Sequence, residues 1–177
     1  MMSQEQLPEA LARVFEQFTE PHALFTALMP ALGETLPCDR CFLYVREPAQ
    51  HRGVITHCWS RNEQATVWIG ADWLEDPTAP QDPLMTIALC TPVAVFVDDI
   101  ETAGSGVVDR TYEREKFRHR ALVHAPIYDH EALIGILECS MIDQPRVWTE
   151  DDRQLIACLQ KTLTLPTKAY IEQYQPF

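Results

Sequence analysis

The sequence predicts an α+β fold, in which helices at both chain ends cover a central antiparallel sheet. Two observations predict it. The apolar runs Ala121–Ile127 and Ala132–Met141 flank a short polar segment, which is the pattern of a β-hairpin. A helix start follows, because Thr149 precedes three acidic residues and Asp152 occupies the capping-box position.

Two helices are expected near the N-terminus. Gln4–Phe18 carries one apolar stripe at helical spacing. His22–Leu36 is apolar on more than one side, so it should lie between the sheet and a second surface. Pro30 lies inside this segment and predicts a kink or break near Ala27.

Four further strands are expected before the hairpin: Cys38–Arg46, Val54–Arg61, Thr66–Ile69 and Ala94–Val97. The first two should pair as a hairpin. Their polarity alternates imperfectly, which is typical of strands covered on both faces.

Short helices should lie between these strands and after them. Leu84–Leu89 is preceded by Asp82 as the cap, with Pro83 at the first helical position. Asp109–Phe117 is highly charged and predicts a short surface helix or lid after a mobile loop. The terminal helix should run from about Glu150 to Leu165, where Pro166 interrupts it; a continuation of the helix over Thr167–Tyr174 is left open.

The composition is that of a soluble globular protein, with 177 residues, 46% apolar and 23% charged. We therefore expect one domain over residues 1–177, with its core at about 22–165 and a separate N-terminal helix within 1–21. The net charge of -12 argues against nucleic acid and anionic membranes as partners. No apolar run is long enough for a membrane helix, and the polar N-terminus is no secretory signal, so a cytoplasmic location is expected.

Four stretches of the chain together resemble a known family. They are LPCDRCFLYV (Leu36–Val45), VFVDDI (Val95–Ile100), RALVHAPI (Arg120–Ile127) and Ala132–Thr149 with the helix that follows. In this order they resemble a GAF domain of the phytochrome- and cyanobacteriochrome-related subgroup, a sensory module of the PAS-like superfamily. The resemblance implies terminal helices on one sheet face and a lid of loops and a short helix on the other.

The same resemblance raises the question of a bilin cofactor. Members of this subgroup hold a linear tetrapyrrole through a Cys followed by a His. Counted back from Arg120, that pair would fall on Asp109-Arg110, and the segment Glu101–Arg120 contains no cysteine. A bilin would therefore need non-covalent or atypical attachment, and the cofactor is left unassigned.

Ligand-binding residues are expected around the lid: Asp98, Arg110, Tyr112, His119, Arg120 and His124. Here a basic rim, made by Arg118, His119 and Arg120 with Arg110 and Arg114, would pair with a carboxylate or phosphate of the ligand. The alternative is a solvated charged helix whose arginines pair with Glu113 and Glu115.

A metal- or redox-responsive module is a further hypothesis, built on Cys38, Cys41 and Cys58. In a strand, residues three apart point to opposite faces about 10 Å apart, so Cys38 and Cys41 could share a metal only if the chain turns there. The alternative is that the cysteines are reduced thiols in the core.

No catalytic motif stands out, since the chain lacks a nucleophile elbow, a P-loop and a GxGxxG sequence. The sequence therefore predicts a non-catalytic sensory or regulatory module that binds a small molecule or a protein partner. Surplus apolar surface on the terminal helices predicts a homodimer through them. Because the chain ends soon after its final helix, we expect signal output through contact with a protein partner.

Overall fold

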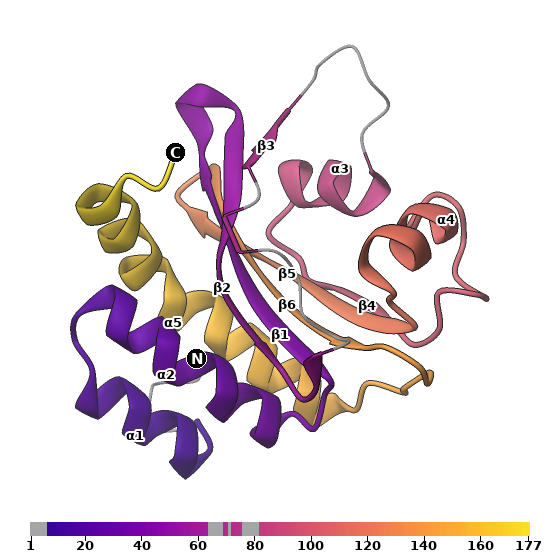
Figure 1. The fold of residues 1–177 in the computed structure, drawn as a ribbon, viewed down its shortest axis with the longest axis horizontal. Helices are drawn as coiled ribbons and strands as arrows, with labels where there is room; N and C mark the ends of the chain where they lie inside the picture. Colours follow the sequence, from indigo (N-terminus) through magenta and orange to yellow (C-terminus); the bar gives the residue numbers. More distant parts are fainter. Residues whose placement is uncertain (1–6, 64–68, 71, 76–81) are drawn as a thin grey trace.

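The computed structural model describes residues 7–63, 69–70, 72–75 and 82–177. Within these residues the centre is a six-stranded antiparallel sheet with strand order β3-β2-β1-β6-β5-β4 (Figure 1). The strands are β1 (Arg40–Glu47), β2 (Arg52–Ser60), β3 (Asp72–Leu74), β4 (Val95–Val97), β5 (Ala121–Asp129) and β6 (Ala132–Met141). The helices are α1 (Glu9–Gln17), α2 (Pro21–Thr35), α3 (Pro83–Cys90), α4 (Arg110–Tyr112) and α5 (Glu150–Tyr174), with short helical segments η2 (Pro48–Gln50) and η4 (Glu113–Phe117).

The sheet has one helical layer on each face (Figure 1). Helices α1, α2 and α5 lie on one face, which we call the helix face. The short elements α3, α4 and η4 lie on the other, which we call the lid face. The predicted α+β fold, with terminal helices on one face and a lid on the other, is confirmed.

Both faces of the central strands are buried, as their imperfect polarity alternation predicts. In β1, Cys41 and Leu43 join the core under the helices, whereas Phe42 and Tyr44 join the core under the lid. Because side chains alternate along a strand, each central strand contributes to both cores. The sheet therefore separates a hydrophobic core under the helices from hydrophobic packing under the lid.

The two predicted hairpins are confirmed. β1 pairs with β2, and β5 pairs with β6 through a turn in which His130 has a positive φ of 54°. Strand β3 lies outside any predicted strand. The strand expected at Thr66–Ile69 falls mostly outside the described residues, and Ile69 itself lies in a turn.

Neither internal proline ends its helix. The break considered near Ala27 and the interruption expected at Pro166 are wrong, whereas the continuation of the terminal helix over Thr167–Tyr174 is confirmed. α2 runs through Pro30, and α5 runs through Pro166 for two further turns. A proline in a helix interior costs about 3 kcal/mol. Buried side chains on both sides of each proline, such as Leu163 and Tyr170 in α5, hold the helix against the sheet and outweigh that penalty.

The expected caps are present. The Thr149 hydroxyl accepts from the Asp152 backbone N–H and the Asp152 carboxylate accepts in return, while the Asp82 carboxylate accepts from the Met85 N–H at the start of α3. These caps fix where α5 and α3 begin on the sheet.

The apolar stripe of α1 packs against another part of the same chain. Leu11 and Val14 are buried, and α1 contacts α2 on the side away from the sheet. The second surface expected for α2 is therefore α1. No helix in the described part of the chain is both long and apolar enough to cross a membrane.

Candidate functional site

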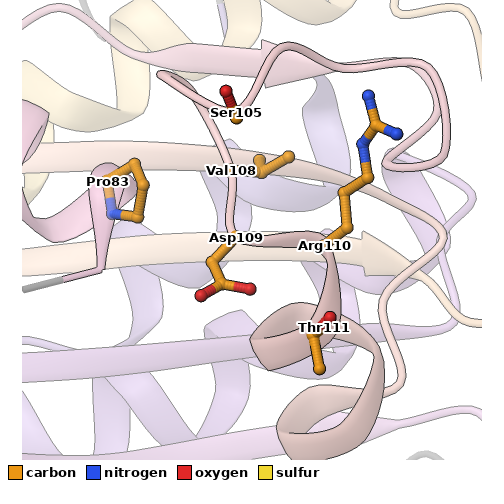
Figure 2. A pocket seen from close by; sticks show the side chains of 6 residues that line it. All are labelled: Pro83, Ser105, Val108, Asp109, Arg110 and Thr111. Atoms are coloured by element: carbon orange, nitrogen blue, oxygen red, sulfur yellow. The ribbon is translucent and has the colours of Figure 1, made fainter.

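An open groove of about 510 Å³ lies on the lid face between the start of α3 and the loop that leads into α4 (Figure 2). Its lining is mixed in character, formed by Pro83, Ser105, Val108, Asp109, Arg110 and Thr111. The volume is in the range of small-molecule sites. The groove therefore lies where the sequence predicts the lid, and it includes the expected ligand residue Arg110.

Two neighbouring charged residues of the groove differ in their freedom to meet a ligand. In Figure 2 the Asp109 carboxylate lies between Pro83 and Thr111, where it also caps α4 by accepting from the Tyr112 N–H at 3.0 Å. The Arg110 side chain extends toward the lid loop and donates to the Ala103 carbonyl oxygen at 3.1 and 2.6 Å. The groove thus presents a carboxylate and hydroxyls, while its arginine is engaged by the lid.

The expected basic rim is not gathered at one place. Arg120 forms a bidentate ion pair with Asp99 at 2.8 and 2.9 Å, and this hydrogen bonding lowers the pKa of Asp99 to about 2. Arg114 pairs with Glu101 at 3.0 Å. The rim arginines therefore fasten the loop between β4 and β5 to itself and to the sheet edge.

A buried network of ionisable side chains lies beneath the lid. His119 Nδ1 lies 2.5 Å from Glu113 Oε2, and its Nε2 lies 2.9 Å from Glu138 Oε1 without hydrogen-bond alignment. His124 Nδ1 lies 2.8 Å from the other Glu138 oxygen. All four residues are at least 93% buried. The structure thus joins the expected residues His119 and His124 through Glu138, while Glu113 contacts His119 alone.

The network holds opposite charges away from water. Burial by itself would lower the pKa of His119, but the charge of Glu138 and the contacts with Glu113 and Glu138 outweigh it and raise that pKa. Burial would raise the pKa of Glu138, but the charge and hydrogen bonding of His119 and His124 lower it. An ionised Glu138 facing a protonated His119 is the state that this arrangement favours.

Aromatic side chains separate this network from the surface. The Phe117 ring stacks on His119, with ring centroids 5.1 Å apart, and on Phe42 at 6.2 Å. Tyr112 meets Phe117 edge to face at 5.7 Å. Burial, with the charge of Asp82 nearby, raises the pKa of Tyr112 to about 12, so this phenol stays neutral. Tyr112 is therefore part of the lid's cover over the network.

Asp82 connects the network to the groove, because it precedes the groove residue Pro83. Burial and then the charge of Glu113 raise the pKa of Asp82 to about 6. Its Oδ1 is buried and has no hydrogen-bond partner among the described residues. A carboxyl group that changes charge near neutral pH therefore lies at the groove edge.

Asp98 lies elsewhere, at the end of β4. Its Oδ1 accepts from the Trp148 N–H at 3.2 Å, and its carbonyl oxygen accepts from the Arg146 N–H. These bonds hold the segment between β6 and α5. The structure thus places Asp98 and Arg120 in fastening roles at the sheet edge, apart from the groove.

The arrangement of the sheet and lid agrees with comparisons to known proteins. The family model described as "GAF domain" matches residues 20–163, which is most of the chain. This chain belongs to the GAF family. The family is generally one of small-molecule-binding sensory modules, which are typically regulatory and not catalytic.

Solved GAF domains share the fold across low sequence identity. A phycocyanobilin-bound GAF domain from a cyanobacterial phytochrome has a TM-score of 0.73 at 18% identity, covering 98% of this chain and 99% of its own. The GAF domain of a phosphoenolpyruvate-protein phosphotransferase from Coxiella burnetii has a TM-score of 0.71 at 12% identity, covering 97% and 98%. A search of curated proteins finds no significant match.

The cysteines of this GAF domain are not grouped as the sequence hypothesis has them. Cys58 packs with the lid-face core, on the opposite side of the sheet from Cys41. The chain turns before β1, so that the Cys38 and Cys41 sulfurs are 3.3 Å apart. The third member of the group is Cys139 of β6.

Sequence reasoning missed Glu138, Glu113 and Cys139. The hairpin register pairs His124 with Glu138, so counting from the turn would have found that partner. Glu113 reads as one more charge on a charged segment, and its burial follows only from contact with His119. Cys139 meets Cys41 through pairing of β1 with β6, which are separated by almost one hundred residues and have no local signal.

Proposed function

We propose that this GAF domain is a non-catalytic sensory module that binds a small molecule in the groove between α3 and the lid. The observation that carries the proposal is the groove itself. It is of ligand size, and it is lined both by the start of α3 and by the lid loop. A ligand there would contact the lid and the α3 start together. Binding would therefore change how the lid lies on the sheet, and this change would be the signal to a partner protein.

The ligand chemistry follows from the groove lining. Asp109 offers a carboxylate, Ser105 and Thr111 offer hydroxyls, and Val108 and Pro83 offer apolar surface. We propose a small polar molecule with hydrogen-bond donors and an apolar portion. Arg110 would add an anion contact only after releasing the Ala103 carbonyl.

A groove-filling variant tests this proposal. Thr111→Trp places a large ring in the groove, whereas Glu16→Trp places the same ring on an exposed site of α1. We expect members of a metabolite library to raise the melting temperature of the wild type and of Glu16→Trp, but not of Thr111→Trp. Equal shifts in all three proteins would contradict binding in the groove.

The second candidate is a bilin-binding photoreceptor with non-covalent or atypical attachment. Two similar solved structures are GAF domains from a cyanobacterial phytochrome, one phycocyanobilin-bound and one phycoerythrobilin-bound. In this chain the position counted for the attaching pair, Asp109-Arg110, lines the groove. Expression with a biliverdin supply tests the idea: a visible absorption band that survives purification supports it, and a colourless protein excludes it.

For partners, we propose a homodimer through the terminal helices. Most of their apolar surface is used within the chain, but Leu165 is 76% exposed and Tyr174 is 41% exposed on α5. These two side chains are nine residues apart on α5, or about two and a half helical turns, so they lie on opposite sides of the helix. Each offers apolar surface to a second copy or to an output partner. Analytical ultracentrifugation of the full chain tests self-association directly.

A further inference from the structure

Three cysteine sulfurs converge in the core under the helices. The Sγ atoms of Cys38, Cys41 and Cys139 all lie within 4.8 Å of one another. Each residue is at most 1% exposed. Among the described residues, no other set of three His, Cys, Asp or Glu side chains is arranged closely enough to hold a metal ion.

The sheet itself brings two of these sulfurs together. Cys41 of β1 and Cys139 of β6 are direct partners in the antiparallel register, and both point to the helix face. Side chains opposite each other on one face of an antiparallel pair have Cβ atoms about 5 Å apart. Strand pairing alone therefore sets the Cys41–Cys139 separation.

A braced turn before β1 supplies the third sulfur. The Asp39 N–H donates to the Ser140 carbonyl at 2.9 Å, and the Asp39 carboxylate accepts from the Ile142 N–H at 2.9 Å. The Arg61 N–H donates to the Asp39 carbonyl at 2.8 Å. These bonds from both neighbouring strands fix the turn, and so they fix the Cys38 sulfur 3.3 Å from that of Cys41.

A half-buried cation lies near Cys38 of the cluster. The Arg146 guanidinium donates to the carbonyl oxygens of Leu36 and Pro37, both at 2.6 Å, and also pairs with Asp152 at 3.0 Å. Hydrogen bonding with Cys139 and Cys41, together with the charge of Arg146, lowers the pKa of the Cys38 thiol, whereas burial raises the pKa of Cys41. A neighbouring cation favours thiolates, which are the form of cysteine that ligates metals.

We propose that Cys38, Cys41 and Cys139 form a three-thiolate site for one thiophilic metal ion, with Cu(I) favoured over Zn(II). Thiolate ligands select Cu(I), Zn(II) and iron–sulfur clusters among biological metals. A metal–sulfur bond of about 2.3 Å places three equatorial sulfurs about 4 Å apart. This lies between the Cys38–Cys41 separation of 3.3 Å and the 4.8 Å within which all three sulfurs lie.

The described cluster has three side-chain ligands and no fourth, and this ligand number favours Cu(I) over Zn(II). Structural Zn(II) is almost always four-coordinate and tetrahedral, whereas the cluster offers three sulfurs in a buried setting. Cu(I) accepts three sulfur ligands. On binding, each ligating thiol releases its proton to solvent, so the affinity rises with pH.

This site lies on the opposite sheet face from the groove, so its test is independent of the proposed ligand binding. Reduced full-length protein is titrated anaerobically with Cu(I), and separately with Zn(II), against a chromophoric chelator. We expect one Cu(I) per chain, a sulfur-to-copper absorption band in the ultraviolet, and weaker competition for Zn(II).

Two matched triple variants locate the site. Cys58→Ala/Cys90→Ala/Cys158→Ala keeps the three proposed ligands and should bind Cu(I) as the wild type does. Cys38→Ala/Cys41→Ala/Cys139→Ala keeps the other three cysteines and should lose the band. If the second triple variant does not fold, the first is decisive, together with Cys38→Ala alone, which should weaken Cu(I) binding by more than about tenfold.

Several results would overturn the proposal. They are the absence of a stoichiometric band in the wild type, loss of the band in the variant that keeps the three ligands, and tighter binding of Zn(II) than of Cu(I). A Cys38–Cys41 disulfide, found by mass spectrometry after alkylation of protein prepared without reductant, would assign the cluster to redox chemistry instead.

Discussion

His57 on the helix face and His119 on the lid face are both buried, and their pKa values are shifted in opposite directions. On the helix face, His57 contacts His22 at 3.0 Å and the rings of Phe25 and Tyr170, and burial lowers its pKa to about 4. On the lid face, His119 lies between Glu113 and Glu138, and its pKa is raised. Burial is common to both sites, so the neighbouring side chains decide the sign.

The difference extends to how each layer is fastened to the sheet. The helices are held by a continuous apolar core that runs from Leu11 of α1 to Leu163 of α5. The lid has two smaller apolar clusters, and the charged network of Glu113, His119 and Glu138 lies beside them. We infer that lid attachment responds to pH and to charge, whereas helix packing responds chiefly to volume.

The largest expected effect is the loss of charge from Glu138. Glu138→Gln keeps the size of the side chain but leaves His119 and His124 without their shared carboxylate. Removing one partner of a buried ion pair costs about 3–5 kcal/mol. Urea unfolding at neutral pH measures it. Glu16→Gln, on an exposed site of α1, should change the unfolding free energy by less than about 0.5 kcal/mol.

If Glu138→Gln and Glu16→Gln lose similar amounts of unfolding free energy, the loss does not come from the lid network. If Glu138→Gln unfolds as easily as Glu16→Gln, the charges under the lid contribute nothing, and the contrast between the two faces fails.

His119→Gln should have a smaller effect that depends on pH. A raised folded-state pKa means that the protonated ring stabilises the fold fully below the unfolded value of about 6.5, and that this contribution is lost as pH rises through the folded pKa. We expect the variant to be less stable by about 1.5–3 kcal/mol near pH 6, the scale of a hydrogen bond to a charged group. The difference in unfolding free energy between wild type and variant should narrow toward pH 9.

Denaturant unfolding of both proteins across this range gives the gap at each pH. A gap that widens with rising pH would mean that His119 is buried neutral, as His57 is, and would remove the contrast.

The contribution of His57 to stability should change with pH in the direction opposite to that of His119, and His57→Phe tests this. The pKa of His57 is lowered to about 4, so between about pH 6.5 and 4 the unfolded chain takes up a proton that the folded protein does not. Wild-type stability should therefore fall by about 1.4 kcal/mol per pH unit from this group, or about 2 kcal/mol by pH 5. The phenylalanine variant lacks this slope.

The measurement is the change in unfolding free energy of each protein between pH 7 and pH 5, because the contacts of His57 with Thr56 and His22 also affect the absolute value. Equal slopes in wild type and variant would show that His57 does not titrate in this range.

The smallest effect on folding is expected from Leu165→Glu. Leu165 is 76% exposed on α5, so the free energy of unfolding should change by less than about 0.5 kcal/mol. Under the proposed homodimer, the same change should weaken self-association in sedimentation experiments. The buried neighbour Leu163→Ala is the matched contrast, with an expected cost of about 2–5 kcal/mol.

Local signals predict much of this fold. The β5–β6 hairpin, the Thr149 cap and the Asp82 cap each depend on residues close together in the chain, and all three are confirmed. The break considered at Pro30 and the interruption expected at Pro166 are wrong for the converse reason. A local rule gives the penalty at Pro30 and Pro166, but the opposing packing energy comes from distant strands.

The sequence by itself determines the order of elements, the GAF fold and the absence of a cysteine between Glu101 and Arg120, because periodicity, capping and motif order are properties of neighbouring residues. Only the tertiary structure decides which polar side chains meet. Strand pairing across the sheet places Cys139 beside Cys41, and folding of the lid places Glu113 against His119. Partners so far apart in the chain are chosen by the packing of the sheet, and their charge states follow from that choice.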